Sequence, residues 1–415
     1  MEAKSTASPI NGAGASTPRS RRYREKRKLI VDAAVPLLND KGVWGMTLQE
    51  VAQALDLTTT SVTYYYRYKE QLAAAVFEDT MSRLSGMVRE AAEAPTPKER
   101  VARYAELYLD QFACARRGQG RPLAVLSEMR TLEESVRDPL IRQYQEVFRA
   151  VRELFGPADT QERKRTGAAK AQFLNEALFW SAMWLRRYPL GDLHNIRRRF
   201  LDILENGIVA PGSAGPLKPV ALQGCEETYA RREFLRVASR LINDIGYKGA
   251  SVDRIVGDLK ITKGSFYHHL AAKDDLILGC YRHDYARLRV LFTTMEQAEL
   301  PVSARLAGIV ATAMNWQFEG DHPLLRTTAL QAMPVAVRGV GIEWFDRTAH
   351  LLSGFLVDGM REGSIRIIDP MIAGHVTIST INSAYDLRSW AGKQQRDQAI
   401  GTYAGLLMNG LFPGT

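Results

Sequence analysis

Two short segments of this sequence are rich in side chains that donate hydrogen bonds or present flat rings. They read TTTSVTYYYRYKEQL at residues 58–72 and ITKGSFYHHLAAKDDL at residues 261–276. Hydroxyls, amines and imidazoles suit phosphate oxygens and base edges, and ring faces suit thymine methyl groups, so we expect both segments to contact DNA. The expected contact residues are Thr58, Thr59, Thr60, Ser61, Thr63, Tyr64 and Tyr65, and then Thr262, Lys263, Gly264, Ser265, Tyr267, His268 and His269.

A lysine opens the helix that follows each segment. Lys69 precedes Glu70 and Lys273 precedes Asp274, where a cation is unfavourable because the helix dipole is positive at that end. A DNA phosphate at the same place would be bound jointly by the lysine and the free backbone N–H groups. We therefore expect Lys69 and Lys273 to bind phosphates.

Residues that can cap helices occur at the same spacing in the two copies. Thr47 and Ser251 precede one apolar-periodic helix, and Thr58 and Thr262 precede the next, short one. Their hydroxyls can accept hydrogen bonds from the free N–H groups of a first turn, and Thr47-Leu-Gln-Glu50 is a full capping box. Two capped helices joined by a tight turn form the helix-turn-helix pattern, whose second helix enters the major groove. Thr47 and Ser251 are therefore also expected at the DNA.

The two regions are copies of one another. A shift of 204 residues, from Ala34 to Ala238, aligns AVPLLNDKGVWGMTLQEVAQAL with ASRLINDIGYKGASVDRIVGDL without a gap. In each copy a glycine, Gly42 or Gly246, follows Asn-Asp-x and is expected to close the first helix with a positive φ. One such polar helix could be ordinary surface, but two in the same context favour DNA contact. A repeat this long indicates a duplicated domain rather than a solenoid.

Residues 27–76 and 231–280 resemble the DNA-binding domain of the tetracycline-repressor (TetR) family. ITKGSFYHHLAAKDDL is close to that family's helix-turn-helix signature. The first copy departs from it, since Thr59-Thr60 stands where the family usually has a Lys-Gly pair, and Pro36 lies inside the first helix. The resemblance implies dimeric transcriptional repressors in which a variable helical ligand-binding domain follows each DNA-binding domain.

Helical periodicity continues through the rest of the chain and strand alternation is almost absent, so the expected fold class is all-α. The segment APGSAGPLKP is the clearest linker. The expected domains are a disordered basic N-terminal arm at 1–22, a first DNA-binding domain at 23–72, a helical regulatory domain at 73–209, a linker at 210–224, a second DNA-binding domain at 225–276 and a second helical regulatory domain at 277–415.

Each half ends in two helical stretches, which in the resembled family build the dimer interface. Because one chain carries two such pairs, we expect its halves to pack on each other as an intramolecular pseudo-dimer, and a homodimer of whole chains stays possible. Large residues at helical spacing in these stretches fit a core and an interface equally well. They are Phe179, Trp180, Trp184, Tyr385 and Trp390.

The regulatory halves also contain candidate contacts to a small-molecule effector. Each candidate has a competing interpretation as plain core, because helical bundles need aromatic residues and methionines in any case. The candidates are Tyr108, Phe112, Met129, Trp316, Phe318, Trp344 and Phe345.

The composition narrows the class of protein. The 415 residues carry a formal net charge of +9 and a pI of about 9.4, which favours an anionic partner such as double-stranded DNA. We find no catalytic residue set, metal site, cofactor motif or membrane-length apolar run, and we expect a cytoplasmic location. The favoured function is a ligand-responsive transcriptional repressor. The alternatives are a constitutive DNA-binding protein without an effector and an α-helical enzyme.

Overall fold

The computed structural model describes residues 18–222, 229–269, 272–326, 330, 333 and 335–413, which form an all-α fold. The first half contains α1 (Pro18–Gly45), α2 (Leu48–Ala54), α3 (Thr59–Thr63), α4 (Lys69–Ala92), α5 (Pro97–Arg116), η1 (Leu126–Thr131), α6 (Glu134–Glu153), α7 (Gln161–Trp184), η2 (Leu185–Arg187), η3 (Leu190–Asp192) and α8 (Leu193–Asn206). The second contains α9 (Tyr229–Gly249), α10 (Val252–Leu259), α11 (Lys263–His269), α12 (Lys273–Glu296), α13 (Val302–Glu319), α14 (Val335–Glu362), α15 (Pro370–Ser383), η5 (Ala384–Leu387), α16 (Arg388–Ala391) and α17 (Arg396–Asn409). Among these described helices, none is long and apolar enough to cross a membrane.

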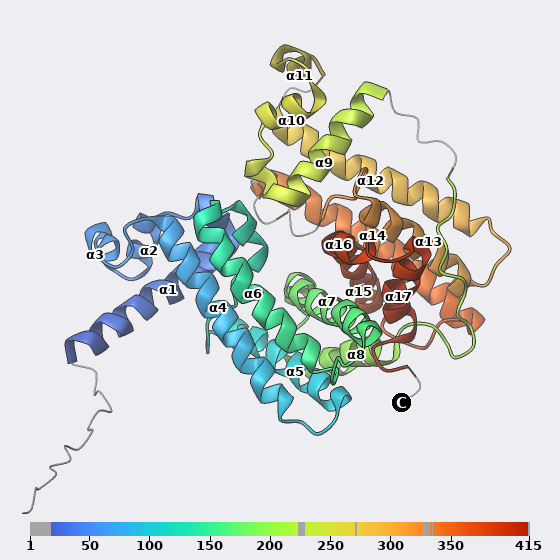
Figure 1. Cartoon of the computed structure of the whole chain (residues 1–415), viewed down its shortest axis with the longest axis horizontal. Coiled ribbons are helices and arrows are strands. Elements are labelled where there is room, and N and C mark those ends of the chain that lie inside the picture. Colours follow the sequence, from blue (N-terminus) through green and yellow to red (C-terminus); the bar gives the residue numbers. More distant parts are fainter. Residues whose placement is uncertain are drawn as a thin grey trace, which may run out of the picture.

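Each half folds as one unit of the same design. Helices α1–α3 and α9–α11 form two heads at separate edges of the molecule, and the remaining helices gather between and below them (Figure 1). Helices α4 and α12 run from each head into the larger helical domain. The domain boundaries expected at residues 72 and 276 therefore fall inside continuous helices, because buried residues on both sides of each boundary keep one helical period (Leu72 with Val76, Leu276 with Cys280).

The first helix begins earlier than expected. Pro18 opens α1, so the basic residues from Arg19 onward are helical, although we expected the disordered arm to reach residue 22. A pair between Arg21 Nε and Glu25 Oε1, 2.9 Å apart at i,i+4 spacing, favours this extra length of helix. Residues 1–17, where the rest of the expected arm falls, lie outside the described residues.

A glycine with a positive φ bends the first helix of each head. Gly42 has a φ of 68° and Gly246 a φ of 75°, which confirms the expectation for both Asn-Asp-x-Gly motifs. A side chain at either position would strain the backbone. One further turn follows each glycine and directs the chain toward the second helix of the head.

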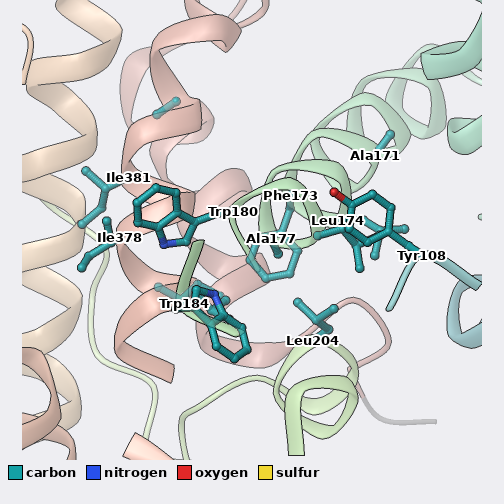
Figure 2. Packing of buried hydrophobic residues seen from close by; sticks show 14 of the residues in the cluster. Tyr108, Ala171, Phe173, Leu174, Ala177, Trp180, Trp184, Leu204, Ile378 and Ile381 are labelled. Atoms are coloured by element: carbon teal, nitrogen blue, oxygen red, sulfur yellow. The ribbon is translucent and has the colours of Figure 1, made fainter. Parts of the chain in front are cut away.

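The two units meet through α7 and α8 of the first and α15 and α17 of the second, which pack together at the centre of the molecule. The rings of Trp184 on α7 and His375 on α15 stack across this contact, with centroids 5.6 Å apart and planes 6° from parallel. In Figure 2, Trp180 of α7 lies beside Ile378 and Ile381 of α15.

Polar contacts support the same pairing. Trp390 Nε1 on α16 donates a hydrogen bond to Arg165 O on α7, at 3.1 Å. At the far ends of α8 and α17, Ile208 N donates to Met408 O (3.1 Å) and Leu411 N donates to Leu204 O (2.9 Å). Each unit therefore donates to the backbone of the other, an arrangement typical of two-fold interfaces.

Candidate DNA-binding surface and effector cavity

The caps expected in the first head are present. Glu50 N donates to Thr47 Oγ1 (3.2 Å) and Thr47 N donates to Glu50 Oε2 (3.1 Å), which completes the capping box. Ser61 N donates to Thr58 Oγ1 at 3.2 Å and starts α3. Because Thr47 and Thr58 already accept these bonds, their first role is to start α2 and α3.

The second head repeats the arrangement. Arg254 N donates to Ser251 Oγ (3.3 Å) and Ser265 N donates to Thr262 Oγ1 (3.2 Å). As the sequence indicated, Arg254 replaces the glutamate of the box, so only the cap remains. The two turns are thus alike in backbone and differ in side chains.

The inner faces of α3 and α11 are buried and their outer faces are open. Val62 and Phe266 are buried, whereas Tyr64 keeps 71% and Tyr267 keeps 55% of its surface exposed. The expected contact residues Thr58, Thr59, Thr60, Thr262, Lys263 and Gly264 are exposed, and Ser61, Thr63, Tyr65 and Ser265 are partly exposed. The side chains of His268 and His269 lie outside the described residues. Large exposed aromatic rings on short capped helices form a surface suited to a DNA groove.

The first head has a feature that the sequence analysis missed. Tyr23, on the basic start of α1, packs against Tyr64 and Tyr65, with ring centroids 6.3 and 5.0 Å away. Next to it, Arg27 Nε donates to Tyr66 Oη at 3.2 Å. The basic extension is therefore attached to the end of α3. The available signal was the spacing of Tyr23 and Arg27, which are four residues apart and therefore lie on the same face of α1.

Lys69 and Lys273 occupy equivalent positions, each at the start of a helix. Lys69 Nζ donates to Trp44 O (2.8 Å) and lies 5.0 Å from the centre of the Trp44 ring. Lys273 Nζ donates to Tyr247 O and lies 4.0 Å from the Tyr247 ring. Both lysines thus join the first helix of the head to the long helix that enters the regulatory domain, and each is the first residue of that long helix, where backbone N–H groups lack partners within the helix.

One asparagine attaches each head to its regulatory domain. Asn39 Nδ2 donates to Leu123 O (2.8 Å), and Val125 N donates to Asn39 Oδ1 (2.9 Å). Asn243 Nδ2 donates to Leu324 O (2.9 Å), and Arg326 N donates to Asn243 Oδ1 (2.9 Å). We call these two contacts the Asn39 and Asn243 attachments. They explain why the Asn-Asp-x-Gly motif occurs in both copies.

A cavity lies inside the second regulatory domain. The centre of a water-sized sphere can move through about 50 Å³ of it, and apolar and aromatic side chains from α12, α13, α14 and α15 make most of its wall. Trp344 and Phe345, both expected as effector contacts, line it together with Tyr285, Ile309, Leu324 and Asn382. The sequence analysis missed Tyr285 and Asn382. A concave, largely apolar space with few polar groups is the usual form of a small-molecule site.

The other expected effector contacts lie outside this lining. Trp316 lies two turns beyond Ile309 on α13, under the Arg287 guanidinium at 4.0 Å, and Phe318 lies on the opposite face near Trp390 (6.3 Å). In the first unit, Tyr108 packs on Phe179 at 5.9 Å and Phe112 lies under Arg116 at 5.9 Å, while Met129 is buried in η1. These side chains lie away from the cavity because of how their helices are rotated and packed. The type of a residue does not specify that packing.

An ionic cluster lies between the units, in which Arg326 is buried, Arg130 is partly exposed and Asp386 is exposed. Arg130 Nη2 from η1 and Arg326 Nη1 both donate to Asp386 Oδ1, at 2.8 and 2.9 Å. Desolvation by neighbouring atoms favours a higher pKa for Asp386, but the charges and hydrogen bonds of the two arginines outweigh it and lower the pKa. Glu176 on α7 is buried nearby, and burial raises its pKa to about 7 despite the attraction of Arg326.

A model of a known protein family matches both heads. The sequence profile described as "Bacterial regulatory proteins, tetR family" matches residues 30–76 and again 234–280. The HTH-type transcriptional regulator BetI of Rhizobium meliloti (strain 1021) is 30% identical over 155 residues, which are 35% of this chain and 72% of BetI. The chain belongs to the TetR family. With two such domains it is a tandem member, and as a member it is a DNA-binding transcriptional regulator.

Other relatives match shorter stretches of this TetR-family chain. The Transposon Tn10 TetC protein of Escherichia coli is 39% identical over 63 residues, 15% of this chain and 32% of TetC. The HTH-type transcriptional repressor AcnR of Corynebacterium glutamicum is 35% identical over 65 residues, 16% of this chain and 35% of AcnR. Among solved structures, AibR in complex with isovaleryl coenzyme A and operator DNA is 19% identical and covers 44% of this chain and 97% of its own, with a TM-score of 0.34.

Proposed function

We propose that this TetR-family regulator is a ligand-responsive repressor that acts as an intramolecular pseudo-dimer on an operator with two unlike half-sites. The observation that carries the proposal is the pairing of two heads with different recognition helices within one chain. A homodimer with identical heads reads a palindrome, because the DNA must mirror the two-fold axis. Unlike heads on a pseudo-two-fold axis call for unlike half-sites, about one to one and a half helical turns apart.

The two recognition helices differ in ways that DNA would register. Thr60 carries a branched side chain where Gly264 has none, so the two backbones would approach the duplex differently. Tyr64 offers a phenol and an exposed ring, whereas His268 at its equivalent position offers imidazole nitrogens. In this proposal the exposed residues of α3 and α11 read bases, and Lys69 and Lys273 bind phosphates.

Ligand response is supported by the cavity in the second regulatory domain and by its place next to a head. Leu324 lines the cavity, and its carbonyl oxygen accepts the hydrogen bond of the Asn243 attachment. A ligand that moved Leu324 would therefore change the position of the second head. A constitutive DNA-binding protein without an effector is the alternative, and a metabolite library that never raises the melting temperature would favour it.

Selection of bound DNA from a random pool, followed by mass measurement of the complex, tests the proposal. We expect one chain on a site whose two halves differ in sequence. A perfect inverted repeat bound by a single chain would refute the proposed operator with two unlike half-sites. Two chains on a longer paired site would indicate a homodimer with four heads.

A further inference from the structure

The cavity of the second unit offers little to a charged ligand. Among the described residues, its lining contains no lysine, arginine or histidine, and Asp284 is its one acid. That carboxylate already accepts a hydrogen bond from Leu325 N (2.6 Å), and Arg287 Nη1 lies 3.9 Å from it. Thr348 Oγ1 donates to Trp344 O at 2.9 Å. An ion entering this space would lose its hydration without gaining a counter-charge, whereas an apolar molecule would gain by burial.

The equivalent place in the first unit is filled. Aligning ERVARY (99–104) with ARLAGI (304–309), and LNEA (174–177) with INSA (381–384), matches Tyr104 to Ile309 and Asn175 to Asn382. Ile309 and Asn382 line the cavity. Tyr104 is fully buried and its hydroxyl donates to Asn175 Oδ1 at 3.3 Å. The tyrosine side chain therefore fills the space that a ligand would occupy. Its hydroxyl also bonds the amide oxygen with which a ligand would interact.

From these observations we propose that each chain binds one neutral, largely apolar small molecule, in the second regulatory domain only. This inference deepens the ligand-responsive part of the proposed function and rests on it. The first unit then serves as a fixed partner that reads DNA, and the second unit senses the ligand. A homodimer with two identical pockets cannot divide the roles in this way.

The structure also indicates where the ligand enters and which contacts pass its effect to the rest of the molecule. Tyr285 lines both the cavity and the open groove beside it, and its ring lies 4.7 Å from the partly exposed Trp344, so the gap between α12 and α14 is the route inward. On the inner side, Phe345 of the wall meets Trp180 of the first unit edge-on at 5.9 Å. Ligand binding therefore acts on the second head through Leu324 and on the first unit through Trp180.

Fluorescence titration of the full chain with N-phenyl-1-naphthylamine, a neutral apolar probe, tests the inference without DNA. We expect one probe per chain. The matched anionic probe 8-anilinonaphthalene-1-sulfonate carries nearly the same rings and should bind about tenfold more weakly or worse, because its sulfonate finds no cation in the cavity. Two neutral probes per chain, none, or equal affinity for both probes would overturn the proposal.

Exchanging the paired residues locates the site. Ile309→Tyr copies the first unit and should remove probe binding, and Tyr104→Ile should open a second site and raise the count to two. If Ile309→Tyr lowers the melting temperature, Thr348→Met fills the same space and gives the same expected loss. Unchanged probe binding in a folded Ile309→Tyr or Thr348→Met chain would refute the location.

DNA binding separates this inference from the proposed function. The probe should change the affinity of the wild-type chain for DNA selected with that chain, and it should have no such effect on Ile309→Tyr, whose tyrosine fills the cavity. Loss of probe binding in Ile309→Tyr, together with loss of the probe's effect on DNA affinity, supports the single site. A wild-type chain that binds the probe but no DNA would instead refute the proposed regulator.

Discussion

Gly207 and Gly410 lie against the end of each other's helix. Both have a positive φ, 70° and 81°, and both follow an asparagine at the end of the last long helix of their unit. A Cβ on Gly207 would collide with Met408 O and Gly410 N, and a Cβ on Gly410 would collide with Glu205 O and Asn206 N. The two units can therefore approach this closely only because neither position has a side chain.

Replacing Gly410 should separate the units at this contact. Gly410→Ala adds both a strained backbone and a backbone collision, so we expect a loss of roughly 2 kcal/mol or more in the free energy of unfolding, measured by urea denaturation. Gly405→Ala on the same helix is the control. Nothing lies within 4 Å of its added Cβ, so it should be neutral or mildly stabilising. Equal effects of the two changes would contradict the role of the close approach.

The lysines at the starts of α4 and α12 should bind phosphates. Lys69→Ala and Lys273→Ala should each weaken binding to every DNA sequence by about the same factor and reduce the salt slope by about one, measured by fluorescence anisotropy at several salt concentrations. Lys98→Ala, at a lysine paired with Glu205 away from the heads, should change neither. Melting curves are needed beside them because Lys69 and Lys273 also hold carbonyl groups within each head. A shift in base preference would contradict the assignment.

The basic extension of α1 should strengthen DNA binding in the first head. Removing residues 1–26 deletes five basic residues of the extension and Tyr23, so both the affinity and the salt dependence should fall. Removing only residues 1–17 is the control, because that segment holds one lysine and one glutamate. If the two truncations behave alike, the extension does not contact DNA.

The Asn39 and Asn243 attachments should act independently on their own heads. Asn243→Ala removes two hydrogen bonds and leaves buried backbone groups without partners, which costs about 1–3 kcal/mol locally. Hydrogen exchange should therefore accelerate in α9–α11 and stay unchanged in α1–α3. Asn39→Ala should do the reverse, so each variant serves as the control for the other. Faster exchange in both heads with either change would show that the units do not move separately.

The buried Glu176 should make stability depend on pH. Burial raises its pKa to about 7, and Arg326, Asp386 and Arg130 face it from the neighbouring cluster. The folded protein holds this proton more tightly than the unfolded chain, so the contribution to stability is complete below the ordinary pKa of a glutamate and disappears as the pH rises through about 7. The free energy of unfolding should fall by on the order of 1–3 kcal/mol between about pH 5 and pH 8.

Glu176→Gln should flatten that pH dependence and should stabilise the protein at about pH 8 relative to the wild type. Glu162→Gln, at an exposed position on the same helix, should leave the slope unchanged. A wild-type protein whose stability rises over this range would contradict the proposed ionisation.

The features predicted correctly from the sequence depend on neighbours within one or two turns. The caps at Thr47, Thr58 and Ser251 require only a hydroxyl and the next three N–H groups, and the turns at Gly42 and Gly246 require only a missing side chain. The arm predicted at residues 1–22 was too long, because α1 already begins at Pro18. Ion pairs such as Arg21 with Glu25 stabilise additional helical residues by a small free energy, and the overall composition of a segment does not reveal such pairs.

By itself the sequence determined the all-α class, the duplication, the two helix-turn-helix heads and the family, because these follow from short-range patterns that recur at a fixed spacing. Only the tertiary structure decided which aromatic residues face the cavity, that Tyr104 fills its counterpart, and that Gly207 meets Gly410. Those relations join residues far apart in the chain, and they depend on how whole helices rotate and pack. A residue's type restricts that packing but does not specify it.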